Sequence, residues 1–410
     1  MSQPSATGTT ATARIDPRYA VVFGACLTQF TVIGLLYSYG LLFKAFETEF
    51  GWSRTLLSGC VSLAFLMMGV LAIPAGRLND RYGPRIVLGV TGTAFGAGFV
   101  LIALVAEPWH LFAIFGLFIA LGLSTHDVVT LGTIARWFER RRGMMTGVVK
   151  VGTAAGQVAV PPLMALLIVT LGWRVAVVVL GIVAAALLLG AAFAMKAAPP
   201  RAEHEQRGLE DDIGFAQVRG TRAFWTLCAI QFLFFSALTT VPLHVVVHGM
   251  DLGLTAALAA GLLSVQGAAS AVGRLAVGAL TDRLSGRQAY AICFVPLIAS
   301  LAAMLVIDTP WPLFAAIAVY GFAHGGFFTV VSPTIAEYFG TRAHGSAFGA
   351  VIFFGTIGGA LGPVLAGRVF DATGGYGWAF ASLAMMAVVG LGLVLSLPAP
   401  TASSTGQARG

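Results

Sequence analysis

The sequence predicts an all-α membrane protein with twelve transmembrane helices. Of its 410 residues, 58% are hydrophobic and only 10% are charged, whereas a soluble chain carries about 25% charged residues. The mean hydropathy is +0.88. This composition excludes an ordinary soluble domain. It also excludes a disordered chain, which combines low hydrophobicity with high net charge.

The apolar residues form twelve runs, each long enough to cross the hydrocarbon core as a helix of about 20 residues. The runs are continuously apolar, which excludes the alternating segments of a transmembrane β-barrel. Fifty-one glycines suit closely packed membrane helices. In chain order the runs are residues 19–44, 54–76, 86–105, 109–135, 143–168, 174–195, 223–248, 255–279, 288–307, 311–336, 346–368 and 378–397.

The runs fall into two groups of six. After a polar tail of residues 1–17, the first six lie within residues 18–196, and we expect them to form one bundle. Residues 197–221 form a polar linker, which we expect to be cytoplasmic. The last six runs lie within residues 222–397, before a tail of residues 398–410. No run remains for a soluble domain.

The two groups are similar in sequence. GRLNDRYGPR at 76–85 matches GALTDRLSGR at 278–287, and TIARWF at 133–138 matches TIAEYF at 334–339. Because six helices separate the copies, both bundles have the same orientation, which is a parallel repeat. Such a repeat is typical of a transporter that rocks one half against the other around a central site.

The basic residues set the topology. Eighteen of the 24 Lys and Arg lie in the two tails and the even-numbered loops. This bias predicts a multi-pass protein with both termini in the cytoplasm. Its partner is then the lipid bilayer and not nucleic acid, despite the net charge of +7. The exceptions near odd-numbered loops are Lys44, Arg54, Arg174 and Arg368, and those inside runs are Lys150 and Arg274.

The sequence offers no sign of an enzyme, a metal site or a cofactor. The first 17 residues lack the apolar core of a signal peptide. All four cysteines fall inside apolar runs, and none has metal-ligand spacing. No nucleotide-binding loop, nucleophilic serine elbow or zinc helix is present.

The repeated loops carry charge clusters that we expect to latch the cytoplasmic side in one state. The alternative is that these charges only set the topology. The expected latch residues are Arg77, Asp80, Arg81 and Arg85 in the first copy, and Asp282, Arg283 and Arg287 in the second.

The first of these loops, GRLNDRYGPR, resembles the signature loop of the major facilitator superfamily. Three further passages resemble its monocarboxylate porter branch, which includes bacterial oxalate/formate antiporter-like members. They are FGWSR at 50–54, RWFERRRGMMTGVVKVGTAAG at 136–156 and GPVLAGRVFDATGGY at 362–376. The resemblance covers essentially the whole chain. It implies a central cavity and proton-linked or exchange transport of small organic anions across a bacterial inner (plasma) membrane.

The sequence departs from that branch at three points. The first helix begins at Asp16-Pro17-Arg18-Tyr19, where animal members have an acidic passage rich in Gly and Trp. Ser270 stands where they carry an Asp. Residues 346–368 contain no Lys, which the oxalate-exchanging relatives have in this helix. These departures bear on proton coupling and on the charge of the substrate.

Ionisable residues inside a membrane are costly and are functional candidates by default. Arg274 lies nine residues before Arg283, about 13 Å into the membrane. Its guanidinium suits bidentate binding of a carboxylate. The resemblance also implies that this arginine binds the carboxylate of the substrate. The alternative is an arginine that is paired for packing.

Asp127 and Lys150 lie at similar depths on consecutive helices, and we expect an ion pair. The pair is either structural or part of proton coupling or gating. His126 adjoins Asp127 about 100° away around the helix, so we expect only Asp127 to face inward.

His324, near the midplane, either exchanges a proton or bonds a neighbouring helix. Tyr320 shares its helix face one turn away. His244 lies near the outer end of its helix and serves either as a gate or as a contact with interfacial water. Through the resemblance, further polar residues are expected to line the substrate cavity: Gln29, Tyr37 and Gln266.

These observations favour a proton-coupled carrier of one small monocarboxylate, such as lactate or pyruvate, that functions as a monomer. A second hypothesis is an exchanger or exporter of dicarboxylates, aromatic acids or drugs, because Lys150 with Arg274 would suit a dianion. A third, outside transport, is a nutrient sensor on the same fold. Such sensors usually carry an added cytoplasmic domain or long tail, whereas the linker here spans residues 197–221 and the last tail residues 398–410.

Overall fold

A computed structural model describes residues 17–138, 142–197, 215–281, 283–339 and 344–398. Within these residues the chain is helical and contains no strand. Twelve helical segments in this described part of the chain are long and apolar enough to cross a membrane. The predicted fold class, a twelve-helix membrane protein, is therefore confirmed.

The first half contains α1 to α7. The fourth span is built from three consecutive pieces, the middle one a π-helix, where the sequence predicts one uniform helix. The elements are α1 (Pro17–Phe50), α2 (Arg54–Tyr82), α3 (Pro84–Ile102), α4 (Pro108–Ala113), η1 (Ile114–Ile119), α5 (Ala120–Trp137), α6 (Arg142–Leu171) and α7 (Trp173–Ala194).

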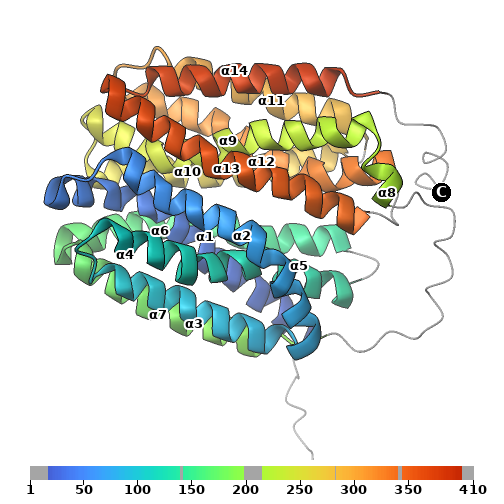
Figure 1. Cartoon of the computed structure of the whole chain (residues 1–410), viewed down its shortest axis with the longest axis horizontal. Coiled ribbons are helices and arrows are strands. Elements are labelled where there is room, and N and C mark those ends of the chain that lie inside the picture. Colours follow the sequence, from blue (N-terminus) through green and yellow to red (C-terminus); the bar gives the residue numbers. More distant parts are fainter. Residues whose placement is uncertain (1–16, 139–141, 198–214, 282, 340–343, 399–410) are drawn as a thin grey trace, which may run out of the picture.

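The second half contains the short α8 and six spanning helices. The elements are α8 (Phe215–Val218), α9 (Arg222–Asp251), α10 (Ala256–Thr281), α11 (Gly286–Met304), α12 (Pro310–Phe339), α13 (His344–Thr373) and α14 (Gly377–Leu395). Each half forms a bundle, and Figure 1 shows α9 to α14 lying against α1 to α7.

Local sequence explains several helix ends. Gly83 takes a φ of 79°, a left-handed conformation that suits glycine, and Pro84 then starts α3. The Ser53 and Ser285 hydroxyls cap the first turns of α2 and α11. We call the end where α7 stops and α9 begins the linker end. The opposite end, where α1 stops and α2 begins, is the outer end (Figure 1).

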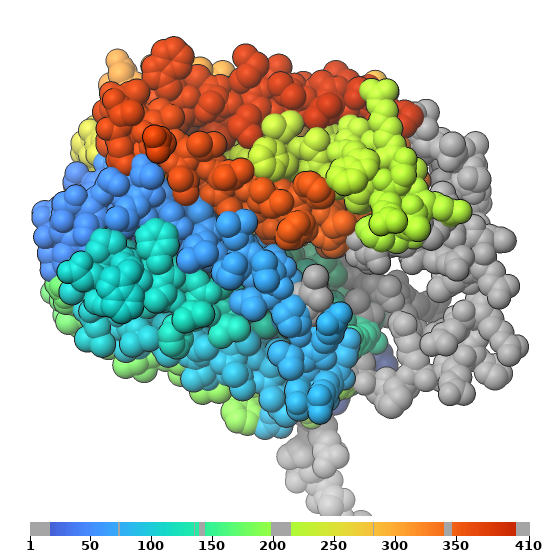
Figure 2. Space-filling view, viewed as in Figure 1, coloured from blue at the N-terminus to red at the C-terminus, as the bar shows by residue number. Residues whose placement is uncertain are grey.

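The halves meet through a symmetric set of helix contacts. Helix α2 packs along α13, as Figure 2 shows on one face of the molecule. Helix α6 packs along α10, and α1 contacts α9. In the repeat, α2 corresponds to α10 and α6 corresponds to α13. The two long contacts are therefore equivalent.

Between described residues, the hydrogen bonds that join the two halves lie between the outer end and the level of Arg274. They join α1 and α2 to α9, α12, α13 and the α13–α14 connection, and they join α6 to α10. The described part of the chain thus holds its halves together on the outer side.

Glycines let the helices within each half cross at very short range. A Cβ built on Gly325 of α12 would lie 1.9 Å from the carbonyl oxygen of Ser270 on α10, and one built on Gly273 would lie 2.1 Å from the carbonyl oxygen of Phe322. No side chain fits at such distances, as in other small-residue membrane interfaces. This crossing places Arg274 next to His324.

Candidate functional site

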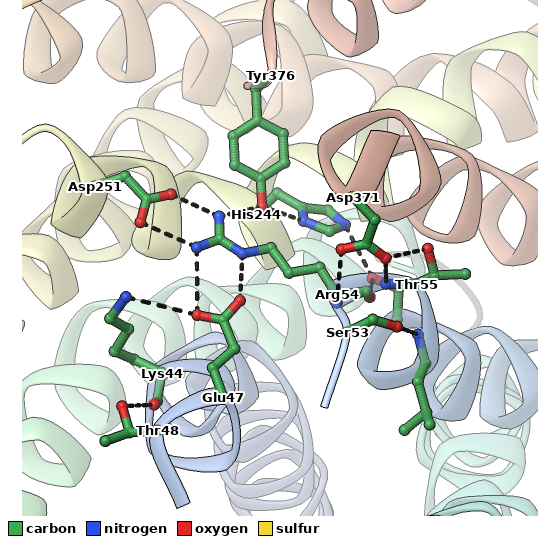
Figure 3. A network of polar contacts seen from close by, with 12 residues as sticks. Lys44, Glu47, Thr48, Ser53, Arg54, Thr55, His244, Asp251, Asp371 and Tyr376 are labelled. Atoms are coloured by element: carbon green, nitrogen blue, oxygen red, sulfur yellow. Dashed lines mark hydrogen bonds and ion pairs between the residues drawn. The ribbon is translucent and has the colours of Figure 1, made fainter. Parts of the chain in front are cut away.

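Arg54, the first residue of α2, is the centre of a polar network at the outer end (Figure 3). Its Nε lies 2.5 Å from Oε1 of Glu47, and Nη1 and Nη2 donate to the two oxygens of Asp251 at 2.6 and 3.0 Å. Nη1 also donates to the Tyr376 hydroxyl at 2.9 Å, and the guanidinium stacks 3.7 Å from the centre of the Phe370 ring. With 2% of its surface exposed, this arginine is fully paired.

Asp371 of α13 caps α2 from the opposite half (Figure 3). Its carboxylate accepts the backbone N–H of Arg54 at 3.1 Å and that of Thr55 at 2.9 Å, as well as the Thr55 hydroxyl at 2.5 Å. A carboxylate at a helix N-terminus is favourable because it satisfies free N–H groups and opposes the helix dipole. The cap therefore ties the two halves together.

His244 joins the same network from α9. Burial raises the pKa of the Tyr376 phenol, so its hydroxyl keeps the proton and donates it to Nδ1 of His244 at 2.9 Å. Nε2 of His244 then carries the other proton and donates to the carbonyl of Pro363 at 3.0 Å. The Ser58 hydroxyl lies 3.1 Å from the same nitrogen. His244 is thus buried among the contacts that close the outer end.

Arg274 lies where α10 crosses α6, with 8% of its surface exposed. Nη1 donates to the main-chain carbonyl of Lys150 at 2.8 Å. Nε and Nη2 have no hydrogen-bond partner, and no acidic residue in the described part of the chain forms an ion pair with this guanidinium. The Phe328 ring lies 5.0 Å from it. The free edge, Nε with Nη2, is one that binds a carboxylate through two parallel bonds.

Asp127 and Lys150 form the ion pair that their depths predict. Nζ of Lys150 donates to Oδ1 of Asp127 at 2.6 Å, and Nε2 of Gln29 donates to the same oxygen at 2.7 Å. Oε1 of Gln29 in turn accepts the Thr153 hydroxyl at 2.9 Å. The Asp127 side chain is 41% exposed, whereas that of His126 is buried. Asp127 is therefore partly accessible although it lies deep in the bundle.

His324 links the halves at the same depth. Its Nε2 lies 2.9 Å from the Tyr37 hydroxyl on α1, and its Nδ1 lies 3.1 Å from the Ser270 hydroxyl on α10. Tyr320, one turn away, instead donates its hydroxyl to the carbonyls of Ala237 and Leu238 on α9. His324 thus contacts both halves, whereas Tyr320 holds α12 against α9.

Two buried glutamines complete the centre of the protein. Gln157 on α6 and Gln266 on α10 are almost fully buried, and neither amide atom of either side chain has a hydrogen-bond partner among the described residues. The sequence analysis did not identify Gln157. Its spacing of seven residues from Lys150 places it on the same helix face two turns away, but this spacing does not show that its amide is unpartnered.

The expected latch residues lie apart from both clusters, at the linker end. Asp80 pairs with Arg136 and not with the arginines of its own loop. Arg81 lies over Tyr82 and Arg85 lies over Phe193. The remaining expected members Arg77, Arg283 and Arg287 are exposed, and Asp282 lies outside the described residues.

Neither a metal cluster nor a disulfide is found among the described residues. No group of three His, Cys, Asp or Glu side chains is placed to hold an ion there. Cys26, Cys60, Cys228 and Cys293 are free thiols.

Comparison with known proteins gives a consistent result. The family model of the Major Facilitator Superfamily matches residues 25–307 and 251–410. Monocarboxylate transporter 11 of Homo sapiens is 27% identical over 389 residues, which cover 89% of this chain and 79% of that protein. The uncharacterized MFS-type transporter YhjX of Escherichia coli (strain K12) is 26% identical over 345 residues, which cover 82% of this chain and 84% of that protein. A crystal structure of a variant of the nucleoside transporter NupG superposes with a TM-score of 0.74 at 14% identity, covering 93% of this chain and all of that one.

Proposed function

Because the chain belongs to the Major Facilitator Superfamily, we propose that this multi-pass membrane transporter carries small monocarboxylates such as lactate and pyruvate together with protons. The mechanism is alternating access, in which the two bundles rock about the central site. The relatives named as monocarboxylate transporters support the substrate class.

The buried, unpaired guanidinium of Arg274 carries this proposal. An isolated buried charge is costly unless an opposite charge compensates it. The two free N–H groups, Nε and Nη2, have the geometry of a carboxylate fork. The substrate's carboxylate is the compensating charge.

The charge balance favours one carboxylate over two. Lys150 already pairs with Asp127 at 2.6 Å, so the central cluster carries one net positive charge, on Arg274. A monoanion neutralises this charge. A dianion would have to break the Asp127–Lys150 pair.

The remaining residues take supporting roles in the proposal. Tyr37, His324 and Gln266 lie beside the arginine or farther out along its helix. Gln29 holds Asp127, and Tyr320 positions α12. Asp127 or His324 carries the proton, while Lys150 and His244 act in coupling or gating. Arg77, Asp80, Arg81, Arg85, Asp282, Arg283 and Arg287 latch the linker end in the other state.

We also propose that the linker end is cytoplasmic and that the chain works as a monomer in a bacterial inner membrane. The support is the excess of basic residues in the linker-end loops. With this orientation, the hydrogen bonds between described residues of the two halves lie on the non-cytoplasmic side. This arrangement corresponds to a state that is closed to the outside.

Uptake by proteoliposomes that contain the purified chain tests the proposal. Under an inward proton gradient, labelled lactate should accumulate, an uncoupler should abolish the accumulation, and pyruvate should compete better than oxalate or succinate. Uptake only into vesicles preloaded with a counter-anion would identify an exchanger. No uptake of any carboxylate would contradict the proposal.

A further inference from the structure

Gln157 stands out because its neighbours are already satisfied. Tyr37, His324 and Ser270 bond one another, while Asp127 and Lys150 pair with each other. The Gln157 amide, both of whose polar atoms are free, is therefore left without a protein partner among the described residues. Buried polar groups are normally hydrogen-bonded, so an orphaned amide at a binding site points to a ligand group.

The backbone places Gln157 beside the carboxylate site. Its Cβ lies 2.8 Å from where a Cβ on Gly267 would lie, at the α6–α10 crossing, and Gly267 is two turns from Arg274. Its side chain lies close to the Tyr37 hydroxyl, without a hydrogen bond of normal geometry, and Tyr37 also lies within electrostatic range of Arg274. Helical side chains lean toward the helix N-terminus, which for Gln157 means toward the turn of Lys150, whose carbonyl holds Arg274.

We infer that Gln157 is a specificity-determining residue that recognises a hydrogen-bonding substituent on the carbon next to the substrate's carboxylate. This inference rests on the proposed function. The carboxylate satisfies Nε and Nη2 of Arg274, and it has no donor for the amide oxygen of Gln157. A 2-hydroxy group supplies both a donor and an acceptor, a 2-oxo group supplies only an acceptor, and an unsubstituted acid supplies neither.

The order of preference follows from this count. Lactate should be carried best, pyruvate less well and propanoate least, although the three acids have the same carbon chain. A site built to hydrogen-bond a hydroxyl rejects the analogue that lacks it, because its own polar groups then stay unpaired. We expect lactate to exceed propanoate in kcat/KM by about tenfold or more.

Transport kinetics of Gln157→Leu in proteoliposomes test the inference. Leucine removes both amide groups at similar volume, so the ratio of kcat/KM for lactate to that for propanoate should fall to about two or less, through loss of lactate transport. Gln231→Leu is the matched control, because Gln231 is equally buried on α9 but packs against Gly355 of α13, away from Arg274. The ratio of kcat/KM for lactate to that for propanoate in Gln231→Leu should equal that of the wild type.

An unchanged ratio in Gln157→Leu, or a wild type without preference for lactate, would overturn the inference. If both acids are carried equally, only the role of Gln157 fails; if neither is carried, the proposed function fails with it.

Thermal unfolding in detergent gives a second readout if Gln157→Leu does not transport. Because the amide is orphaned without substrate, its removal should raise the Tm of the empty protein, and lactate should then stabilise the variant no more than propanoate does. A lowered Tm in the empty variant, with the stabilisation by lactate intact, would mark Gln157 as a structural residue.

Discussion

Arg54 and Arg274 are both buried, but only Arg54 has carboxylate partners among the described residues. Arg54 donates to two carboxylates, Glu47 and Asp251, and has a fixed position at the outer end. Arg274 donates only to a carbonyl and keeps two N–H groups free. The first arrangement suits a structural contact between halves, and the second suits a charged ligand that comes and goes.

The Asp127–Lys150 pair provides a prediction at this scale. Asp127→Asn leaves the ammonium without its counter-charge, and we expect a loss of about 1–3 kcal/mol of stability, at the lower side of values for buried pairs because Asp127 is 41% exposed. Lactate uptake should also cease to follow the pH gradient. Parallel measurements of thermal unfolding and of gradient-driven uptake check both effects.

The double variant Asp127→Asn with Lys150→Met separates the two roles. Removing both charges should restore stability, since no charge is left unpaired, while coupling to the gradient stays lost. If Asp127→Asn keeps full coupling, the pair is structural only.

The sequence identified charged residues inside apolar runs. It missed residues whose importance depends on which side chains they contact in the folded chain. A charge inside an apolar run, such as Arg274, is conspicuous. Arg54 has the appearance of a loop charge, because its partners Asp251 and Tyr376 lie 197 and 322 residues away in the chain. Gln157 is a neutral residue in a glycine-rich run, and only the packed structure shows that its amide is unpartnered.

At the scale of elements, glycine sets how closely α10 and α12 approach. Gly325→Ala places a methyl group against the carbonyl of Ser270, so α12 must move and we expect a loss of about 1–3 kcal/mol. The control is Gly190→Ala on α7, where a Cβ would meet nothing within 4 Å. It should be neutral or slightly stabilising because alanine favours helix.

Thermal unfolding of both alanine variants in the same detergent measures this difference. Equal Tm values for Gly325→Ala and Gly190→Ala would show that the crossing is not as tight as described.

The helices themselves were largely predictable from hydropathy. The run at 223–248 corresponds to α9 (Arg222–Asp251), and the run at 288–307 corresponds to α11 (Gly286–Met304). The first helix is longer than its run, because α1 continues through Glu47 to Phe50. The apolar run ends at the charged Lys44, whereas the helix continues to Phe50, and Glu47 in this last part pairs with Arg54. The π-helix at Ile114–Ile119 left no pattern in the sequence.

At the scale of the whole molecule, the outer network should bias the carrier toward the state closed on that side. Asp371→Ala removes the cap that α13 places on α2, and we expect the outer end to open more often. A cysteine at Ser58, which is fully buried here, reports this opening through its reaction with a water-soluble thiol reagent, in a chain whose four native cysteines are replaced.

Asp308→Ala is the control for that experiment, because Asp308 is an exposed acid on the outer connection between α11 and α12. We expect faster labelling with Asp371→Ala and no change with Asp308→Ala. Equal rates in both variants would show that the cap does not hold the halves together. The sequence repeat predicted two parallel halves, but it did not indicate which end is closed, because that depends on contacts between the halves.

The most direct measurement is the binding of labelled lactate to the purified protein, compared between the wild type and Arg274→Gln. Removing an uncompensated buried charge should not destabilise the chain, so thermal unfolding serves as the folding control. We predict saturable binding to the wild type, weaker binding to Arg274→Lys because lysine lacks the planar fork, and no binding to Arg274→Gln. Undiminished binding to a folded Arg274→Gln would contradict the assignment of the carboxylate to this arginine.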